Sequence, residues 1–206
     1  DAAEKLKAEA AEEGCSIELC RADLTTDKGM QRLLDSVGDR LSGLVHCAAT
    51  GVHRPFPELT LRHFDWTYAL NVRAFFDLVH RLLPRFETGT TILAVSSEGA
   101  VSAVPYYTLV GSSKGALESM VRHLAVELAP RGIRVNAISP GTVMTDAWEV
   151  LPDREERLAE AIRRSPLGRL VTLDEVAAAA QFLCSAAASG IVGQTLVVDG
   201  GARIVG

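Results

Sequence analysis

The chain has 206 residues, 48% of them hydrophobic and 23% charged, with a mean hydropathy of +0.16. This composition predicts one soluble domain with a substantial buried core. The net charge of −5 and the pI near 5.6 argue against a nucleic-acid-binding protein, and no apolar run is long enough to span a membrane. The four cysteines and five histidines lack paired metal-ligand spacing, so we expect free thiols in a cytoplasmic protein and no metal site.

Strand and helix patterns alternate along the chain. The predicted helices span residues 1–13, 26–41, 60–86 (as two pieces), 107–129, 154–164 and 173–187. The predicted strands span residues 16–20, 43–48, 91–96, 134–138 and 194–198. This alternation is typical of an α/β fold in which a doubly wound parallel sheet has helices on both faces, in three αβα layers.

Tyr107 and Lys114 lie seven residues apart near the start of the predicted helix 107–129. Because an α-helix has 3.6 residues per turn, positions seven apart lie within about 20° of each other, whereas Tyr106 would lie about 80° away. A cation close to a phenol lowers the pKa of the phenol, so Lys114 would help Tyr107 to donate a proton near neutral pH. The pair therefore predicts an acid catalyst.

Four motifs, in this order along the chain, resemble those of the short-chain dehydrogenase/reductase superfamily. They are Val95-Ser96-Ser97-Glu98-Gly99, Tyr107 with Lys114, Arg134-Val135-Asn136-Ala137-Ile138-Ser139-Pro140-Gly141, and Val197-Val198-Asp199-Gly200-Gly201. Most members of the superfamily place the catalytic Tyr four residues before the Lys, where this chain has Val110. A Tyr seven residues before the Lys is the arrangement of its enoyl-acyl-carrier-protein reductases. Residues 48–55 and 64–67 are most similar to the NADPH-dependent branch, the enoyl reductase III type.

The resemblance implies a Rossmann-like fold and a set of catalytic residues. Tyr107 would be the acid, and Lys114 would bind the ribose of the cofactor. Asn71 would connect the lysine to a proton relay through its backbone carbonyl and a water, unless it is a polar residue bonded to a neighbouring helix. Ser97 lies where ketoreductases place the serine that polarises the carbonyl, and it would either bind the thioester or only line the pocket.

The resemblance also implies a binding site for NADPH, with NADH as a possible cofactor. Asp23 and Leu24 would hold adenine, although Asp23 or Thr25 could instead cap the helix that follows. The small residues Ala48 and Ala49 would let the backbone approach the adenine ribose. The remaining expected contacts come from the turn after strand 134–138: Pro140, Gly141, the backbone of Val143 and the hydroxyl of Thr145.

We expect residues 1–206 to belong to a single domain that is incomplete at its N-terminus. The resemblance makes residues 16–20 the third strand of the order 3-2-1-4-5-6, and the sequence contains no glycine-rich phosphate-binding turn. About 40–50 residues, one βαβ unit, would therefore precede this chain. Residues 146–166 alternate apolar and charged side chains and would form a substrate lid that suits an acyl chain.

The predicted function is reduction of a 2-enoyl thioester, with hydride transfer from NAD(P)H to the β-carbon. The substrate would be carried by acyl-carrier protein or coenzyme A, in fatty-acid biosynthesis or a related tailoring pathway. One alternative is a ketoacyl reductase that uses Tyr106 or Tyr107, and another is a cofactor-free, non-catalytic homologue. Because the helices at 64–86 and 107–129 are apolar over wide arcs, we also expect a homo-oligomer, most simply a tetramer.

Overall fold

The computed structural model describes residues 2–144 and 154–205, and the chain divides into two compact units, Asp1–Asp39 and Arg40–Gly206. The first unit contains helices α1 (Ala2–Glu12) and α2 (Asp27–Ser36). The Thr26 side chain accepts a hydrogen bond from the Gly29 N–H, so Thr26 caps α2, and neither Asp23 nor Thr25 does. The strand predicted at 16–20 is wrong, because a strand needs the backbone groups of a neighbour and no described residue pairs with this segment.

The second unit is built on a four-stranded parallel sheet. Its strands are β1 (Leu41–His46), β2 (Phe86–Val95), β3 (Arg134–Pro140) and β4 (Thr195–Val198), in the order β1-β2-β3-β4. This confirms the predicted parallel α/β sheet, although β2 begins five residues earlier than expected. Because all four strands run in one direction, their carboxyl ends meet at one edge of the sheet, which is where ligands bind in open α/β folds.

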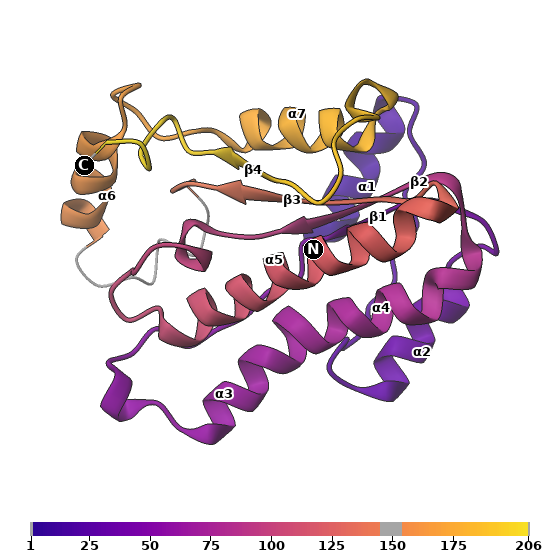
Figure 1. The fold of residues 1–206 in the computed structure, drawn as a ribbon, viewed down its shortest axis with the longest axis horizontal. Coiled ribbons are helices and arrows are strands. Elements are labelled where there is room, and N and C mark those ends of the chain that lie inside the picture. Colours follow the sequence, from indigo (N-terminus) through magenta and orange to yellow (C-terminus); the bar gives the residue numbers. More distant parts are fainter. Residues whose placement is uncertain (1, 145–153, 206) are drawn as a thin grey trace. The chain divides into compact units, whose positions relative to one another are not determined.

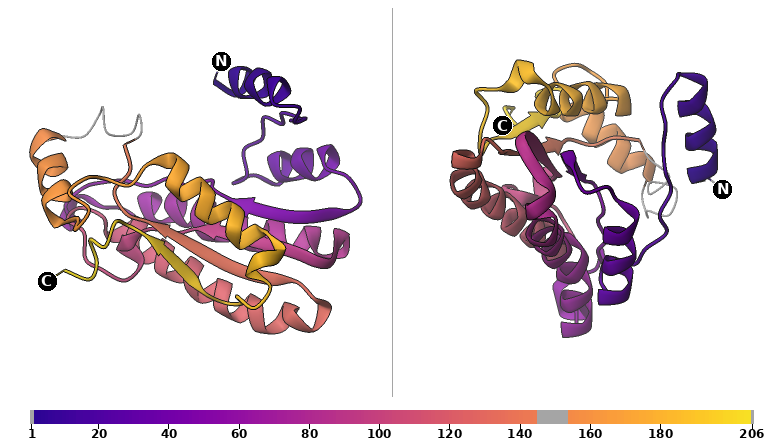
Figure 2. Two further views of the ribbon diagram at one scale, coloured as in Figure 1. Left: turned by 90° about the horizontal axis from the view of Figure 1, so that it is seen from above. Right: turned by 90° about the vertical axis from the view of Figure 1, so that its right-hand side faces the viewer.

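Helices cover both faces of this sheet (Figures 1 and 2). Helices α3 (Leu61–Tyr68), α4 (Ala74–Leu82) and α5 (Thr108–Leu128) lie on one side, and α7 (Leu173–Cys184) lies on the other. Helix α6 (Arg154–Arg164) lies beyond the carboxyl ends of β3 and β4. A π-helix at Ala69–Arg73 joins α3 to α4. Short 3-10 helices span Phe56–Glu58, Leu83–Arg85, Glu98–Ala100, Ala129–Arg131 and Ala186–Ala188.

The core lies on both faces of the two central strands, where apolar residues of β2 and β3 meet apolar residues of the helices. Leu93 of β2 and Ile138 of β3 pack with Leu183 of α7 on one face. On the face covered by α3, α4 and α5, Phe75 of α4 and Leu117 of α5 are fully buried. Full burial of one such side chain stabilises the fold by about 1.5–3 kcal/mol. Strands that are apolar on both faces are typical of parallel sheets covered by helices. The runs of buried residues in β2 and β3 therefore agree with the helices seen on both faces of the sheet.

No helix within residues 2–144 and 154–205 is long and apolar enough to cross a membrane. Cys15, Cys20, Cys47 and Cys184 are all free thiols. Among the described residues, no three His, Cys, Asp or Glu side chains gather as a metal site would require.

Candidate active site

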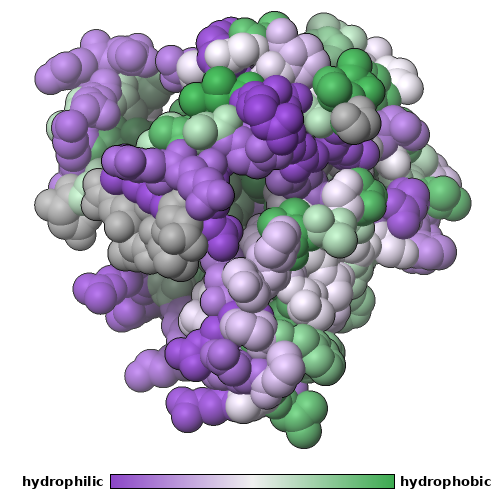
Figure 3. Space-filling model, turned by 90° about the vertical axis from the view of Figure 1, so that its left-hand side faces the viewer, coloured by the Kyte–Doolittle hydropathy of each residue, from purple (hydrophilic) through white to green (hydrophobic). Residues whose placement is uncertain are grey.

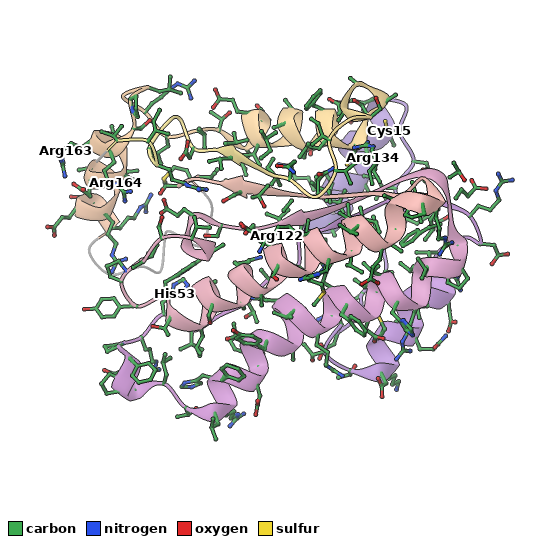
Figure 4. The ribbon with its side chains drawn as sticks, viewed as in Figure 1. Cys15, His53, Arg122, Arg134, Arg163 and Arg164 are labelled. Atoms are coloured by element: carbon green, nitrogen blue, oxygen red, sulfur yellow. The ribbon has the colours of Figure 1, made fainter. Side chains whose placement is uncertain are left out.

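The candidate site lies at the carboxyl edge of the second unit's sheet, where the segments after β1 and β2 meet the start of α5. Figure 4 shows His53, from the segment after β1, near the first turns of α5. Figure 3 looks onto this side of the molecule, and both apolar and hydrophilic residues reach the surface there. Exposed apolar side chains come from several segments at this edge, including Phe56, Val101, Tyr106 and Met144.

Tyr107 is the N-cap of α5 and stands just outside the helix, with φ −114° and ψ 13°. Its ring rests on Gly99, where an added Cβ would come within 2.5 Å of the ring atom Cε1. Its hydroxyl lies 3.3 Å from the Ser97 hydroxyl, so the structure brings these two predicted residues together. The 3-10 turn at Glu98–Ala100 thus positions the phenol.

Burial is the largest influence on the pKa of Tyr107 and raises it, while the Ser97 hydrogen bond opposes the rise and Glu98 adds to it. The prediction that Lys114 lowers this pKa is therefore wrong in this structure. The reason is geometric, because Tyr107 has non-helical dihedrals and its hydroxyl bonds to Ser97, whereas the Lys114 ammonium bonds elsewhere. The phenol is held in its protonated form at neutral pH.

Lys114 is almost fully buried on α5, with 4% of its surface exposed. Its Nζ donates a hydrogen bond of 2.7 Å to the Val95 carbonyl at the end of β2. Burial lowers the pKa of Lys114 to about 8, and Cys47 partly opposes this shift. An ammonium has three donors, so two remain to hold hydroxyl groups of a ligand at the carboxyl edge.

Asn71 lies in the π-helix and is fully buried. Its side-chain amide accepts a hydrogen bond from the Thr50 N–H (2.8 Å) and donates to the Thr50 carbonyl and the Ser113 hydroxyl (2.9 Å each). The side chain therefore fastens the segment after β1 to α5. This agrees with the structural alternative for Asn71, while the role of its backbone carbonyl in a relay stays a prediction. π-Helical turns of this kind are frequent at functional sites.

Val110 occupies the position where a four-residue spacing would place the acid, and it is buried. Its side chain packs on Gly51, where an added Cβ would overlap the Val110 Cγ2 atom. The position is thus filled by a hydrocarbon that packs against the segment after β1 and has no proton to give.

Sequence reasoning missed two residues around Tyr107 and Lys114. The ring centroid of His53 lies 5.2 Å from that of Tyr107, with a tilt of 42°, and burial, followed by Arg157, lowers the pKa of His53. His46, at the end of β1, is buried with its Nε2 lacking a partner among the described residues. Burial, followed by Lys114, lowers the pKa of His46 to about 4. The available signal was their place in the chain, since His46 ends β1 and His53 lies in the segment that follows it.

The predicted cofactor-binding residues divide among three places. Asp23 and Leu24 belong to the first unit, where the Asp23 carboxylate accepts hydrogen bonds from the N–H and hydroxyl of Thr25 that lower its pKa. Ala48 and Ala49 follow β1, Pro140 ends β3 and Gly141 follows it, all at the carboxyl edge of the second unit's sheet. Val143 forms a parallel bridge with Val171. Thr145 and the first part of the predicted lid, 146–153, lie outside the described residues.

These residues fit a nicotinamide cofactor on chemical grounds. The buried Lys114 retains free donors, and Ser139, just before Pro140, has a buried hydroxyl without a partner among the described residues. The residues that follow β1 are small, so a ligand can approach the backbone closely.

A model of the enoyl-(acyl carrier protein) reductase family matches residues 1–203 of the chain. The 1-cyclohexenylcarbonyl-CoA reductase of Streptomyces collinus is 38% identical over 210 residues, which cover 100% of this chain and 75% of that protein. The 7α-hydroxysteroid dehydrogenase of Escherichia coli is 36% identical over 189 residues, which cover 88% of this chain and 72% of that protein.

Solved structures share the fold. The enoyl-(acyl-carrier-protein) reductase (NADH) from Aquifex aeolicus VF5 gives a TM-score of 0.87 at 30% identity, covering 98% of this chain and 82% of that one. A 7α-hydroxysteroid dehydrogenase complexed with NADH and 7-oxo glycochenodeoxycholic acid gives 0.90 at 35% identity, covering 98% and 80%. The predicted Rossmann-like α/β fold is confirmed.

Proposed function

Because the chain belongs to the enoyl-(acyl carrier protein) reductase family of the short-chain dehydrogenase/reductase superfamily, we propose that it reduces the carbon–carbon double bond of 2-enoyl thioesters. The observation that carries this proposal is the placement of the acid. Tyr107 lies seven residues before Lys114, and the position four residues before Lys114 holds the buried Val110. In an enoyl thioester the oxygen that gains charge lies three bonds beyond the carbon that accepts hydride, so the acid must be displaced from the place that suits a ketone.

In this proposal Tyr107 is the proton donor, Lys114 binds the cofactor and Ser97 orients Tyr107. A nicotinamide cofactor would supply the hydride to the β-carbon. The Tyr107 hydroxyl, kept protonated by the raised pKa of its phenol, donates a hydrogen bond to the thioester oxygen and supports the charge of the enolate. It then gives up the proton that completes the reduction, which the α-carbon takes up as the enolate returns to a thioester. Lys114, with a pKa of about 8, is mostly protonated at neutral pH and holds the ribose hydroxyls. Ser97 orients the phenol through its hydroxyl.

We propose NADPH as the preferred cofactor, with NADH as the alternative, and a coenzyme A or acyl-carrier-protein thioester as the substrate. The Streptomyces relative is named for a coenzyme A thioester, and the Aquifex structure for an acyl carrier and NADH. Comparison of kcat/KM for NADPH and NADH, and for one acyl group on each carrier, distinguishes these possibilities. A location in the cytoplasm belongs to the same proposal.

The test is a comparison of crotonyl-CoA with acetoacetyl-CoA, followed through oxidation of NADPH. We expect turnover of crotonyl-CoA, and turnover of acetoacetyl-CoA that is about 10²-fold lower because the acid is misplaced for the ketone. Equal or faster reduction of acetoacetyl-CoA would overturn the proposal.

A carbonyl reductase is the second candidate, favoured by the identity of 36% to a hydroxysteroid dehydrogenase. The Ser97 and Tyr107 hydroxyls, 3.3 Å apart, are the groups that would face a carbonyl oxygen. The same assay decides between the two reactions. A cofactor-free homologue, the third alternative, would bind neither NADPH nor NADH in a fluorescence titration.

A further inference from the structure

Tyr106 adopts a left-handed backbone conformation with φ 61°, and it is the one non-glycine residue with positive φ in the described parts of the chain. Such a conformation strains any residue with a Cβ, and Gly, Asn or Asp relieve the strain. An aromatic residue at this position is therefore unfavourable for the fold by itself. Residues in strained conformations persist when surrounding structure fixes them, and they cluster at functional sites.

The turn at residue 106 sets the position of Tyr107 at the start of α5. The Tyr107 N–H donates to the Val104 carbonyl, and the Tyr107 carbonyl accepts from the Gly111 N–H as α5 begins. This geometry needs a residue that tolerates positive φ. It does not need an aromatic ring, so the turn accounts for the conformation of Tyr106 but not for its side chain.

The Tyr106 ring is not explained by packing either. Half of its surface is exposed (50%), and its hydroxyl makes no hydrogen bond within residues 2–144 and 154–205. The ring belongs to the same edge as other exposed apolar side chains, Val101 and Met144, in segments that follow β2 and β3. Its backbone adjoins the phenol whose hydroxyl we assign to the thioester oxygen.

We propose that the Tyr106 ring is a specificity-determining contact for the acyl chain of the substrate, on the side of the double bond remote from the thioester. This inference rests on the proposed function, since it takes Tyr107 as the group that binds the thioester oxygen. The ring offers an apolar surface that a bound hydrocarbon chain would cover. The strain at residue 106 is retained because Asn or Gly would remove that surface.

Two variants separate the ring from the turn. Tyr106→Asn removes the ring and tolerates positive φ, whereas Tyr106→Phe keeps both the ring and the strain. Each is compared with the wild type in kcat/KM for crotonyl-CoA and for trans-2-octenoyl-CoA, and in the melting temperature Tm. The ratio of the two kcat/KM values reports on acyl recognition, because displacement of Tyr107 would lower both values together.

In Tyr106→Asn we expect kcat/KM for octenoyl-CoA to fall about tenfold and that for crotonyl-CoA by less than about threefold. Relief of strain should raise Tm by about 2–4 °C. Tyr106→Phe should keep the wild-type ratio and Tm. An equal loss on both substrates, an unchanged ratio, or a lower Tm in Tyr106→Asn would overturn the inference.

Failure of the proposed function looks different. If the wild type reduces 3-oxoacyl-CoA and not 2-enoyl-CoA, the proposed reaction is wrong, and the same variants test the acyl contact with acetoacetyl-CoA and 3-oxooctanoyl-CoA. A wild type that reduces no acyl thioester of either kind would overturn both.

Discussion

Burial acts in opposite directions on the pKa values of the two residues that define the site. It raises the pKa of the Tyr107 phenol and lowers that of the Lys114 ammonium, because a low-dielectric surrounding disfavours whichever form is charged. At neutral pH Tyr107 therefore keeps its proton, as its proposed role as the acid requires. Lys114, with a pKa of about 8, still carries its charge at neutral pH. A protonated phenol at Tyr107 and a charged ammonium at Lys114 are the states that the proposed reductase needs near neutral pH.

The first prediction is that Tyr107→Phe and Lys114→Ala fail in different ways. Phe keeps the ring on Gly99 but removes the proposed donor to the thioester oxygen, so kcat should fall by about 10²–10³-fold with little change in the KM for NADPH. Ala at 114 removes the ammonium that is held by the Val95 carbonyl, so the KM for NADPH should rise as kcat falls. Steady-state kinetics with crotonyl-CoA measures both.

Tyr68→Phe is the matched control, because Tyr68 stacks on Phe64 in α3 and lies outside the candidate site. Its kinetics should match the wild type. Wild-type kcat in Tyr107→Phe would refute the placement of the acid.

The second prediction concerns His46 and acid. In the folded state its pKa is about 4, against about 6.5 for an unperturbed histidine, so the unfolded chain binds more protons as pH falls from 6.5 towards 4. Above pH 6.5, His46 is neutral in both the folded and the unfolded states and does not change the free energy of unfolding with pH. Between pH 6.5 and 4 the unfolded state gains a proton that the folded state does not, so the free energy of unfolding falls by up to about 3 kcal/mol. Urea unfolding of His46→Asn at a series of pH values should show a flatter decline than the wild type; parallel declines would contradict the prediction.

At the scale of elements, the junction between the 3-10 turn and α5 fixes the phenol. Gly99 and Gly111 approach each other there, since a Cβ at 111 would lie 2.7 Å from the Gly99 carbonyl oxygen. The left-handed residue that precedes Tyr107 costs about 1–2 kcal/mol for an ordinary side chain. The two glycines and the strained turn thus define where the hydroxyl points.

The third prediction is that Gly99→Ala displaces the Tyr107 ring. The new Cβ would lie 2.5 Å from Cε1 of that ring, closer than atoms pack, so the ring must move. A displacement near 1 Å can cost up to about 10²-fold in rate, and we expect kcat for crotonyl-CoA to fall by about 10–100-fold. Gly190→Ala, where an added Cβ meets nothing within 4 Å, is the control. Wild-type kcat in Gly99→Ala would mean that the phenol position is not critical.

Four of the predicted strands are confirmed, with ends shifted by a few residues, and the apolar runs of the two central ones, β2 and β3, are buried. Helix 154–164 is confirmed as well, although none of its residues is fully buried. The sequence could not indicate the π-helix at 69–73, where Asn71 bonds to Thr50 and Ser113 in segments far from it along the chain. The catalytic pairing of Tyr107 with Lys114 stays a prediction from spacing, and the pKa values of the two residues depend on burial that spacing does not specify.

At the scale of the whole molecule, α4 and α5 each carry apolar residues on an outer face. Phe75 and Val121 are fully buried in the core, but Phe76 is 52% exposed and Val126 is 76% exposed. Side chains of this kind on neighbouring helices favour contact with a second copy. The homotetramer expected from the sequence stays a prediction, and we expect Phe76 and Val126 to lie in its subunit contacts.

The fourth prediction is that Phe76→Arg and Val126→Arg reduce the oligomer to smaller species. A buried guanidinium without a partner would oppose the apolar contact. Light scattering at micromolar concentration should give the tetramer mass for the wild type and for Leu167→Arg, a control with a similarly exposed side chain away from α4 and α5. A wild-type monomer, or variants that remain tetrameric, would contradict it.

The hydrogen bonds of Asn71 also bear on how the site meets its ligand. The Thr50 amide belongs to a connecting segment, yet it donates to a side chain that is fully buried. Hydrogen exchange at this amide should therefore be as slow as in the core, because it requires the opening of α5 and the π-helix. A segment held in this way is ordered before any ligand arrives. Binding at this edge then loses little conformational entropy, and affinity depends on the contacts themselves.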